Sequence, residues 1–142
     1  RGVFEVRRLL ESGAAELAAT RITAEQLVEL REIAEACAAC FGDPARKREM
    51  LDYDARFHLL IADAAGNESL KAEILRFNRR VRVIQWLRLA PAKMRVAFDE
   101  HMEILKGLEA HDPHAARQAM SHHIREALTF VLEGLPESEP LA

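Results

Sequence analysis

Apolar residues recur along this chain at intervals of three and four, the spacing that places them on one face of an α-helix. In the first helical segment the expected inward stripe comprises Val3, Val6, Leu9/Leu10, Ala14, Leu17 and Ala18. The predicted helices cover residues 3–20, 23–42, 43–65 (starting there or a turn later), 68–90, 91–110 and 113–134. No segment alternates in the manner of a β-strand. The pattern therefore predicts an all-α fold, an antiparallel bundle of about six helices.

Helix-boundary residues support this division. Thr23, with Gln26 three residues later, has the form of a capping box at the start of the second helix. The pair Gly66–Asn67 combines a residue suited to the end of one helix with a cap for the next. Asp-Pro pairs at 43–44 and 112–113 combine a cap with proline at the first helical position. Short loops therefore join the predicted helices.

Composition limits the class of protein. With 142 residues, 49% of them hydrophobic, the chain fits one globular domain. With a net charge of −3, the chain lacks the positive field of a DNA-binding surface. No apolar run has the roughly 18 to 20 residues of a membrane span. We expect a cytoplasmic location, no membrane association, a helical domain over residues 1–135 and a frayed tail over 136–142. Because the sequence starts at Arg1 inside a predicted helix, we also expect a fragment of a longer protein.

The two cysteines, Cys37 and Cys40, form a C-x-x-C motif. Such a motif is half of a zinc site or a redox pair in some proteins, but here no second pair and no preceding strand accompanies it. Both residues lie in an apolar run of the second helix, so we favour buried or half-buried free thiols. Their role stays open.

Polar residues fall on inward helix faces, where apolar residues are expected. In the third helix Asp54 and His58 are four residues apart and so lie one above the other on the buried stripe. The stripes of the fifth and sixth helices place His101 and His123 inward, whereas His122 is turned about 100° away from His123. A buried carboxylate destabilises the fold by several kcal/mol unless it is paired.

A divalent metal held by Asp54, His58, His101 and His123 would satisfy all four side chains. One anionic oxygen and three imidazole nitrogens suit Zn²⁺ best, and also Ni²⁺, Co²⁺ or Mn²⁺. A second interpretation remains open at this point: each histidine is a hydrogen-bonded core residue, and Asp54 with His58 is only an i,i+4 pair.

At these residues the sequence resembles the C-terminal effector-binding (FCD-type) domain of the FadR subfamily of GntR-type bacterial transcriptional regulators. Each matching stretch is weak alone, but together they occur in order over nearly the whole chain. The stretches are F-E-V-R-R-L-L-E at 4–11, A-A-E-L-A-A at 14–19, D-A-R-F-H at 54–58, A-A-G-N at 64–67, E-H-M-E-I-L at 100–105 and A-A-R-Q-A-M-S-H-H-I at 115–124.

The resemblance implies a helical bundle, a metal bound by an aspartate and three histidines, and a small carboxylate effector beside that metal. The family's motifs map onto the same four residues, Asp54, His58, His101 and His123. The resemblance also implies a homodimer that binds DNA through an N-terminal winged helix-turn-helix domain, which this sequence does not include. It identifies neither the effector nor its sign, as inducer or corepressor.

Three further residues are candidates for effector binding. Arg7 matches the family's first-helix arginine, and a guanidinium can hold a carboxylate through two hydrogen bonds. The alternative for Arg7 is a surface ion pair with Glu11. Arg82 lies in a basic run that is usually a solvated face, and Trp86 suits core or dimer packing as well as a ligand wall.

The sequence thus favours a ligand-sensing and dimerisation domain that is not an enzyme. The alternative is a metal-dependent hydrolase on a small three-histidine helical bundle, in which an open metal site activates water. Against it, no free carboxylate or serine stands beside the four ligands as an evident general base. A third interpretation is a structural bundle without metal.

Overall fold

The computed structural model describes residues 2–88 and 91–133, and all regular elements in these ranges are helical. The α-helices are α1 (Gly2–Ala19), α2 (Ala24–Ala38), α3 (Lys47–Ala64), α4 (Glu68–Arg88), α5 (Pro91–Glu109) and α6 (Pro113–Glu133), and a short 3-10 helix, η1 (Pro44–Arg46), precedes α3. The all-α prediction is confirmed. The expected tail, residues 136–142, lies outside the described residues. Among the helices described, none combines the length and apolarity needed to cross a membrane.

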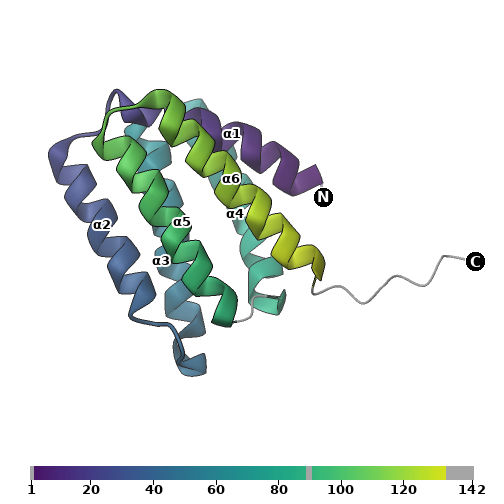
Figure 1. The fold of residues 1–142 in the computed structure, drawn as a ribbon. Coiled ribbons are helices and arrows are strands. Elements are labelled where there is room, and N and C mark those ends of the chain that lie inside the picture. The colour runs from purple at the N-terminus through teal and green to yellow at the C-terminus, as the bar shows by residue number, and fades with distance from the viewer. Residues whose placement is uncertain (1, 89–90, 134–142) are drawn as a thin grey trace, which may run out of the picture.

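The six α-helices pack into a closed ring. Going round it, α1 packs on α6, α6 on α5, α5 on α2, α2 on α3, α3 on α4, and α4 on α1. Figure 1 shows α2, α3 and α5 on one side of the bundle and α1, α4 and α6 on the other. α1 also crosses the interior to contact α3 and α5. The interior is therefore surrounded by α1, α3, α5 and α6, which carry the polar residues described below.

The predicted caps are present. The Thr23 hydroxyl accepts from the Gln26 N–H, and the Gln26 side chain accepts from the Thr23 N–H, which completes the capping box. Gly66 has a φ of 68°, the left-handed conformation that glycine adopts most easily, and the Asn67 side chain caps α4. The residues at these helix ends therefore form the caps that the sequence predicts.

Two predictions about helix limits and faces were wrong. The helix α2 ends at Ala38, not near residue 42, because residues 39–43 form tight turns closed by bonds such as the Phe41 N–H to the Ala38 carbonyl. In α1 the apolar residues Val6 and Leu9 are 38% and 63% exposed. The buried stripe of α1 instead includes two charged residues, Arg7 and Glu11. The buried face of α1 therefore combines Phe4 and small apolar residues with a charged pair.

The helices α5 and α6 approach each other closely at Gly107. A Cβ atom added at Gly107 would lie 2.8 Å from the backbone nitrogen of Ala116, closer than such atoms approach one another. Both residues are buried, and α5 and α6 meet the same apolar cluster through Leu108 and Ile124. Glycine is therefore required at this crossing, which fixes the spacing of the two helices.

The substitution Gly107→Ala is expected to lower stability, because its methyl group would push α5 away from α6. Overpacking of this kind destabilises by about 1–3 kcal/mol, which lowers the melting temperature by several degrees in a domain of this size. The matched control is Gly13→Ala in α1, where an added Cβ meets nothing within 4 Å. That change should raise stability by about 0.5–1 kcal/mol, since alanine favours helix. Equal melting temperatures for the two variants would contradict the close helix crossing.

Candidate metal centre

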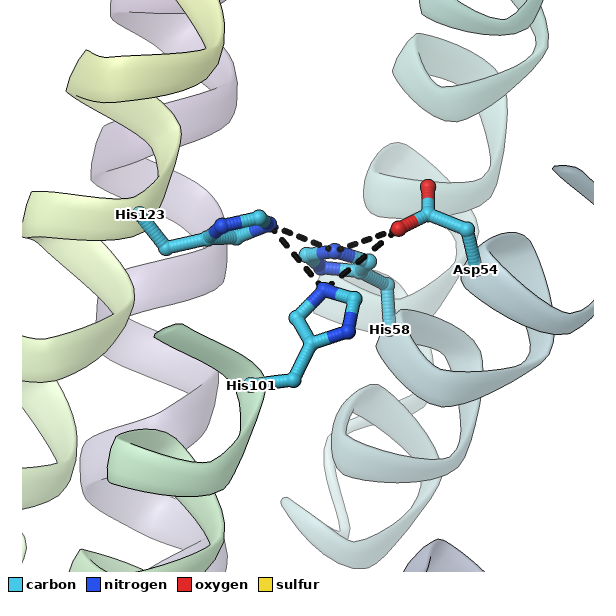
Figure 2. A group of neighbouring side chains, drawn as sticks. All are labelled: Asp54, His58, His101 and His123. Atoms are coloured by element: carbon cyan, nitrogen blue, oxygen red, sulfur yellow. Dashed lines mark hydrogen bonds and ion pairs between the residues drawn. The ribbon is translucent and has the colours of Figure 1, made fainter. Parts of the chain in front are cut away.

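Four polar side chains from three helices meet in the interior. Asp54 and His58 come from α3, His101 from α5 and His123 from α6, and Figure 2 shows all four pointing toward one another. The Nε2 atom of His123 lies 3.2 Å from Nε2 of His101 and 3.2 Å from Nε2 of His58. The Asp54 Oδ1 atom lies 3.4 Å from Nε2 of His101. The structure thus brings together the four residues that helix periodicity selected, and we refer to them as the cluster.

Each member of the cluster is held in place by its own helix or by a neighbour. Asp54 and His58 lie one turn apart on the buried face of α3. The His101 ring stacks on Phe57, with ring centroids 4.2 Å apart and an angle of 18° between the planes. The Asp54 Oδ2 atom accepts from the Gln85 side chain at 3.4 Å, so that Oδ1 is the oxygen turned toward the histidines. The donor atoms are therefore fixed by packing before any ligand binds.

The protonation states suit metal binding. Burial lowers the pKa of His123 to about 3 and the pKa of His101 well below its usual value, so both rings are neutral at pH 7. Burial alone would raise the pKa of Asp54, but His58 and His101 outweigh it and the pKa falls below its usual value. His101 and His123 are therefore neutral imidazoles and Asp54 is an ionised carboxylate, the forms in which these side chains bind metal.

Two carboxylates that the sequence analysis missed stand behind the histidines. Glu11 of α1 contacts the Nδ1 atom of His58, and Glu100 of α5 lies 2.6 Å from the Nδ1 atom of His123. Both carboxylates are engaged with a histidine of the cluster, so neither is free to act as a general base. The sequence held one signal, because Phe4, Arg7 and Glu11 share a helical stripe with Ala14 and Ala18.

Glu11 fixes the tautomer of His58. Burial would raise the pKa of Glu11, but Arg7 and His58 together lower it to about 2, so the carboxylate is ionised at pH 7 and only accepts hydrogen bonds. A proton on Nδ1 of His58 is therefore donated to Glu11, and Nε2 of His58 faces the cluster. For Glu100, burial raises the pKa to about 7, so this carboxyl group is partly protonated at neutral pH.

Arg7 forms the ion pair with Glu11 that its spacing suggested, but in the interior and not on the surface. Its Nε atom donates to Glu11 at 2.7 Å and to the Asn78 side chain at 3.2 Å, and the side chain is almost wholly buried. The Nη1 atom is buried and has no hydrogen-bond partner among the described residues. A buried guanidinium with an unpaired donor is unfavourable unless another acceptor reaches it.

The donor set fits a divalent metal. With bonds of roughly 2.0–2.1 Å, ligands arranged as a tetrahedron lie about 3.3 Å from one another. The separations of 3.2, 3.2 and 3.4 Å between donor atoms fall near this value, although Asp54 Oδ1 is 3.9 Å from His58 Nε2. Without a cation, the lone pair of His58 Nε2 would face a second nitrogen at hydrogen-bond distance. Carboxylates behind two of the imidazoles are the usual support of metal-binding histidines.

A narrow cleft of about 30 Å³ leads from the cluster toward the surface between α4, α5 and α6. Asp54, Gln85 and His123 line its inner end, and Lys93 and Phe130 line its outer end. We call this space the inner cleft. Its free volume suffices for little more than a water molecule.

Arg82 and Trp86 lie elsewhere. Together with Arg48, Leu51 and Val83 they line an open hollow of about 420 Å³ on the outer side of α3 and α4, and Arg82 pairs with Asp52. The structure therefore does not bring these two candidates to the inner cleft.

The two cysteines are free and buried. The Cys37 thiol lies 3.5 Å from the Met50 carbonyl, and burial, together with nearby Asp54 and Cys40, raises its pKa to about 12. Burial also raises the pKa of Cys40. Both thiols are thus protonated and poorly reactive at neutral pH, as expected for the buried thiols that we favoured.

Comparison with known proteins identifies relatives of this chain. Residues 2–126 match the family described as the FCD domain. The Exu regulon transcriptional regulator of Escherichia coli (strain K12) is 33% identical over 129 residues, which cover 86% of this chain and 47% of that protein. The HTH-type transcriptional regulator LutR of Bacillus subtilis (strain 168) is 31% identical over 129 residues, covering 86% and 57%. This chain spans about half the length of these relatives.

Solved structures agree with the fold. Streptococcus agalactiae GntR superposes with a TM-score of 0.74 at 29% identity, over 88% of this chain and 55% of that one. Escherichia coli McbR/YncC superposes with a TM-score of 0.82 at 19% identity, over 93% and 63%, which supports the fold alone.

Proposed function

Since this chain belongs to the FCD domain family, we propose that it is the ligand-sensing and dimerisation domain of a GntR-type transcriptional regulator of the FadR subfamily. In this proposal it binds a divalent metal and a small carboxylate effector, and the bound effector modulates DNA binding in the cytoplasm by a winged helix-turn-helix domain of the parent protein. The relatives are regulators and the family is one of regulator domains, so the domain is not an enzyme.

The observation that carries the metal proposal is the convergence of three Nε2 atoms and Asp54 Oδ1 in the buried interior. Zinc is the preferred ion, because a set of three neutral imidazoles and one carboxylate matches its ligand preference, and nickel, cobalt or manganese would also bind it. A cation on Nε2 of His123 would strengthen the donor character of its Nδ1–H. Glu100 would then be held as the carboxylate.

The carboxylate proposal rests on charge. A divalent cation with one carboxylate ligand keeps a positive charge that favours an anionic effector. Arg7 would add a second attraction, because its unpaired Nη1 donor would gain an acceptor. We therefore propose Arg7 as an effector-binding residue together with the metal. Arg82 and Trp86 remain weaker candidates, since they line the separate hollow on α3 and α4.

Signalling would follow from the position of α1. This helix carries Arg7 and Glu11, and it packs on α3, α4 and α6. An effector bound to Arg7 and to the metal would favour one packing of α1 over another, and differential affinity for two packings is what shifts their populations. In a dimer, such a shift would change the spacing of the attached DNA-binding domains.

Metal content tests the first part of the proposal. The purified domain is expected to hold close to one divalent metal per chain, and chelation should lower its melting temperature. A ligand at a thousand times its dissociation constant stabilises by about 4 kcal/mol. His123→Ala should remove most of this gain, whereas His122→Ala, which changes an exposed neighbour, should not. Equal losses from the two variants, measured by elemental analysis and thermal melts, would refute the proposed ligand set.

The carboxylate behind His123 allows a finer test. Glu100→Gln should weaken zinc binding by about 10- to 100-fold, because a neutral amide no longer holds the Nδ1–H of His123 as firmly. Glu103→Gln on the same helix removes an equal charge at an exposed position and should leave the affinity unchanged. Competition with a chromophoric chelator measures both. Identical affinities would mean that Glu100 does not support a metal ligand.

Effector binding is tested by thermal shift with hydroxy acids, sugar acids, dicarboxylates and aromatic acids, on zinc-loaded and zinc-free protein. An effector should raise the melting temperature only when zinc is present. Arg7→Lys keeps the charge but loses the second guanidinium donor, and about 1.5 kcal/mol, or ten-fold in affinity, is expected to be lost. Arg8→Lys on the same helix is the control. Equal binding to the zinc-free protein would restrict the metal to a structural role, and no binding at all would reject the carboxylate class.

A further inference from the structure

Two helices contact each other at Lys93, a residue that lines the inner cleft. Lys93, in the first turn of α5, pairs with Glu133 in the last turn of α6. The Lys93 ammonium also lies 4.4 Å from the centre of the Phe130 ring, which sits beside it in the wall of the cleft. The contact therefore lies at the Lys93 end of the cleft that reaches His123 and Asp54, although Glu133 itself does not line this cleft.

The ion pair between Lys93 and Glu133 is easy to break. The side chains of Lys93 and Glu133 are 31% and 58% exposed, and ion pairs with this degree of exposure contribute little to stability. A cleft of about 30 Å³ admits no carboxylate metabolite, so a ligand that reaches the cluster by this route has to displace Glu133 or move Lys93. Breaking the pair leaves the half-buried Lys93 ammonium without Glu133, next to the Phe130 ring.

The charges along the cleft decide which ligand can replace Glu133. Among the described residues that line it, Lys93 is the single lysine or arginine, whereas Asp54 and Glu100 supply acids at the inner end. A ligand with one carboxylate on the metal and a second acid group at its far end would restore the pairing of Lys93. A monocarboxylate of the same length would leave Lys93 unpaired.

We propose that Lys93 is a specificity-determining residue that selects effectors with a second acid group, and that Glu133 occupies Lys93 in their absence as a built-in competitor. This inference rests on the proposed function, because it takes the first carboxylate to be bound at the metal. It adds the ligand class, a dicarboxylate or another doubly acidic metabolite. It also assigns roles to two residues outside the cluster.

The test compares lactate with malate and 2-hydroxyglutarate. All three offer the same hydroxy-carboxylate group to a metal, but the last two carry a second carboxylate on a shorter and a longer arm. Calorimetric titration of the zinc-loaded protein should show that one diacid binds more tightly than lactate. Lys93→Gln should weaken the diacid by about ten-fold and change lactate by less than about two-fold. The control Lys106→Gln removes an equal charge from the exposed side of α5 and should alter neither.

The variant Glu133→Gln provides an independent test, because it should strengthen diacid binding where Lys93→Gln weakens it. Removing Glu133 should tighten diacid binding by about two- to five-fold, since exposed pairs are weak. Lactate binding should stay unchanged, because lactate does not reach Lys93 and the pair can re-form once lactate has entered. Equal effects of Lys93→Gln on lactate and the diacid, or weaker diacid binding in Glu133→Gln, would overturn the role of Lys93. The same holds if lactate binds zinc-loaded protein as tightly as either diacid, an outcome that leaves the proposed function standing. Binding of none of the three would instead reject hydroxy-carboxylates at the metal, and this inference with them.

Discussion

The structure depends on the burial of four polar donor atoms that face one another. Taken out of water, a carboxylate and three imidazoles are unfavourable unless each finds a partner, and here the donor atoms that face inward meet only one another. A cation between them would give all four donor atoms one shared partner. Several features serve that arrangement: Phe57 stacks on one ring, Gln85 orients Asp54, and Gly107 lets α5 and α6 approach closely enough for His101 to meet His123.

Much of the fold followed from periodicity and caps. Six helices, the capping box at Thr23 and the turn at Gly66 are local features, and local rules predict them well. The limit of α2 was harder, because Ala39, Cys40 and Phe41 continue the apolar run of the helix, yet the chain turns there. The four cluster residues were found because each stands as a polar exception on an otherwise apolar face.

What the sequence did not reveal lies in the interactions between helices. The inward face of α1 was assigned by hydrophobicity, yet the structure exposes Leu9 and buries Arg7 and Glu11. A buried ion pair is stable only when further hydrogen bonds surround it, and those come from His58 and Asn78, far along the chain. The pattern within α1 places Arg7 and Glu11 on one stripe, but it does not identify these partners on other helices. Glu100 was not predicted for the same reason, since its partner His123 is on another helix.

The order of the ligands along the chain has a consequence for how the domain would be assembled. Asp54 and His58 are one turn apart on α3, whereas His123 is 65 positions from His58. A metal joining them would act as a reversible cross-link that closes a long loop, in the way a disulfide does, and longer loops gain more from closure. The α3 pair can hold an ion as soon as that single helix forms, but the cross-link is complete only when the α5–α6 hairpin docks. Metal supply would therefore govern the last step of folding, so that a chain made in metal-poor conditions would keep its helices while its final hairpin remained loosely attached.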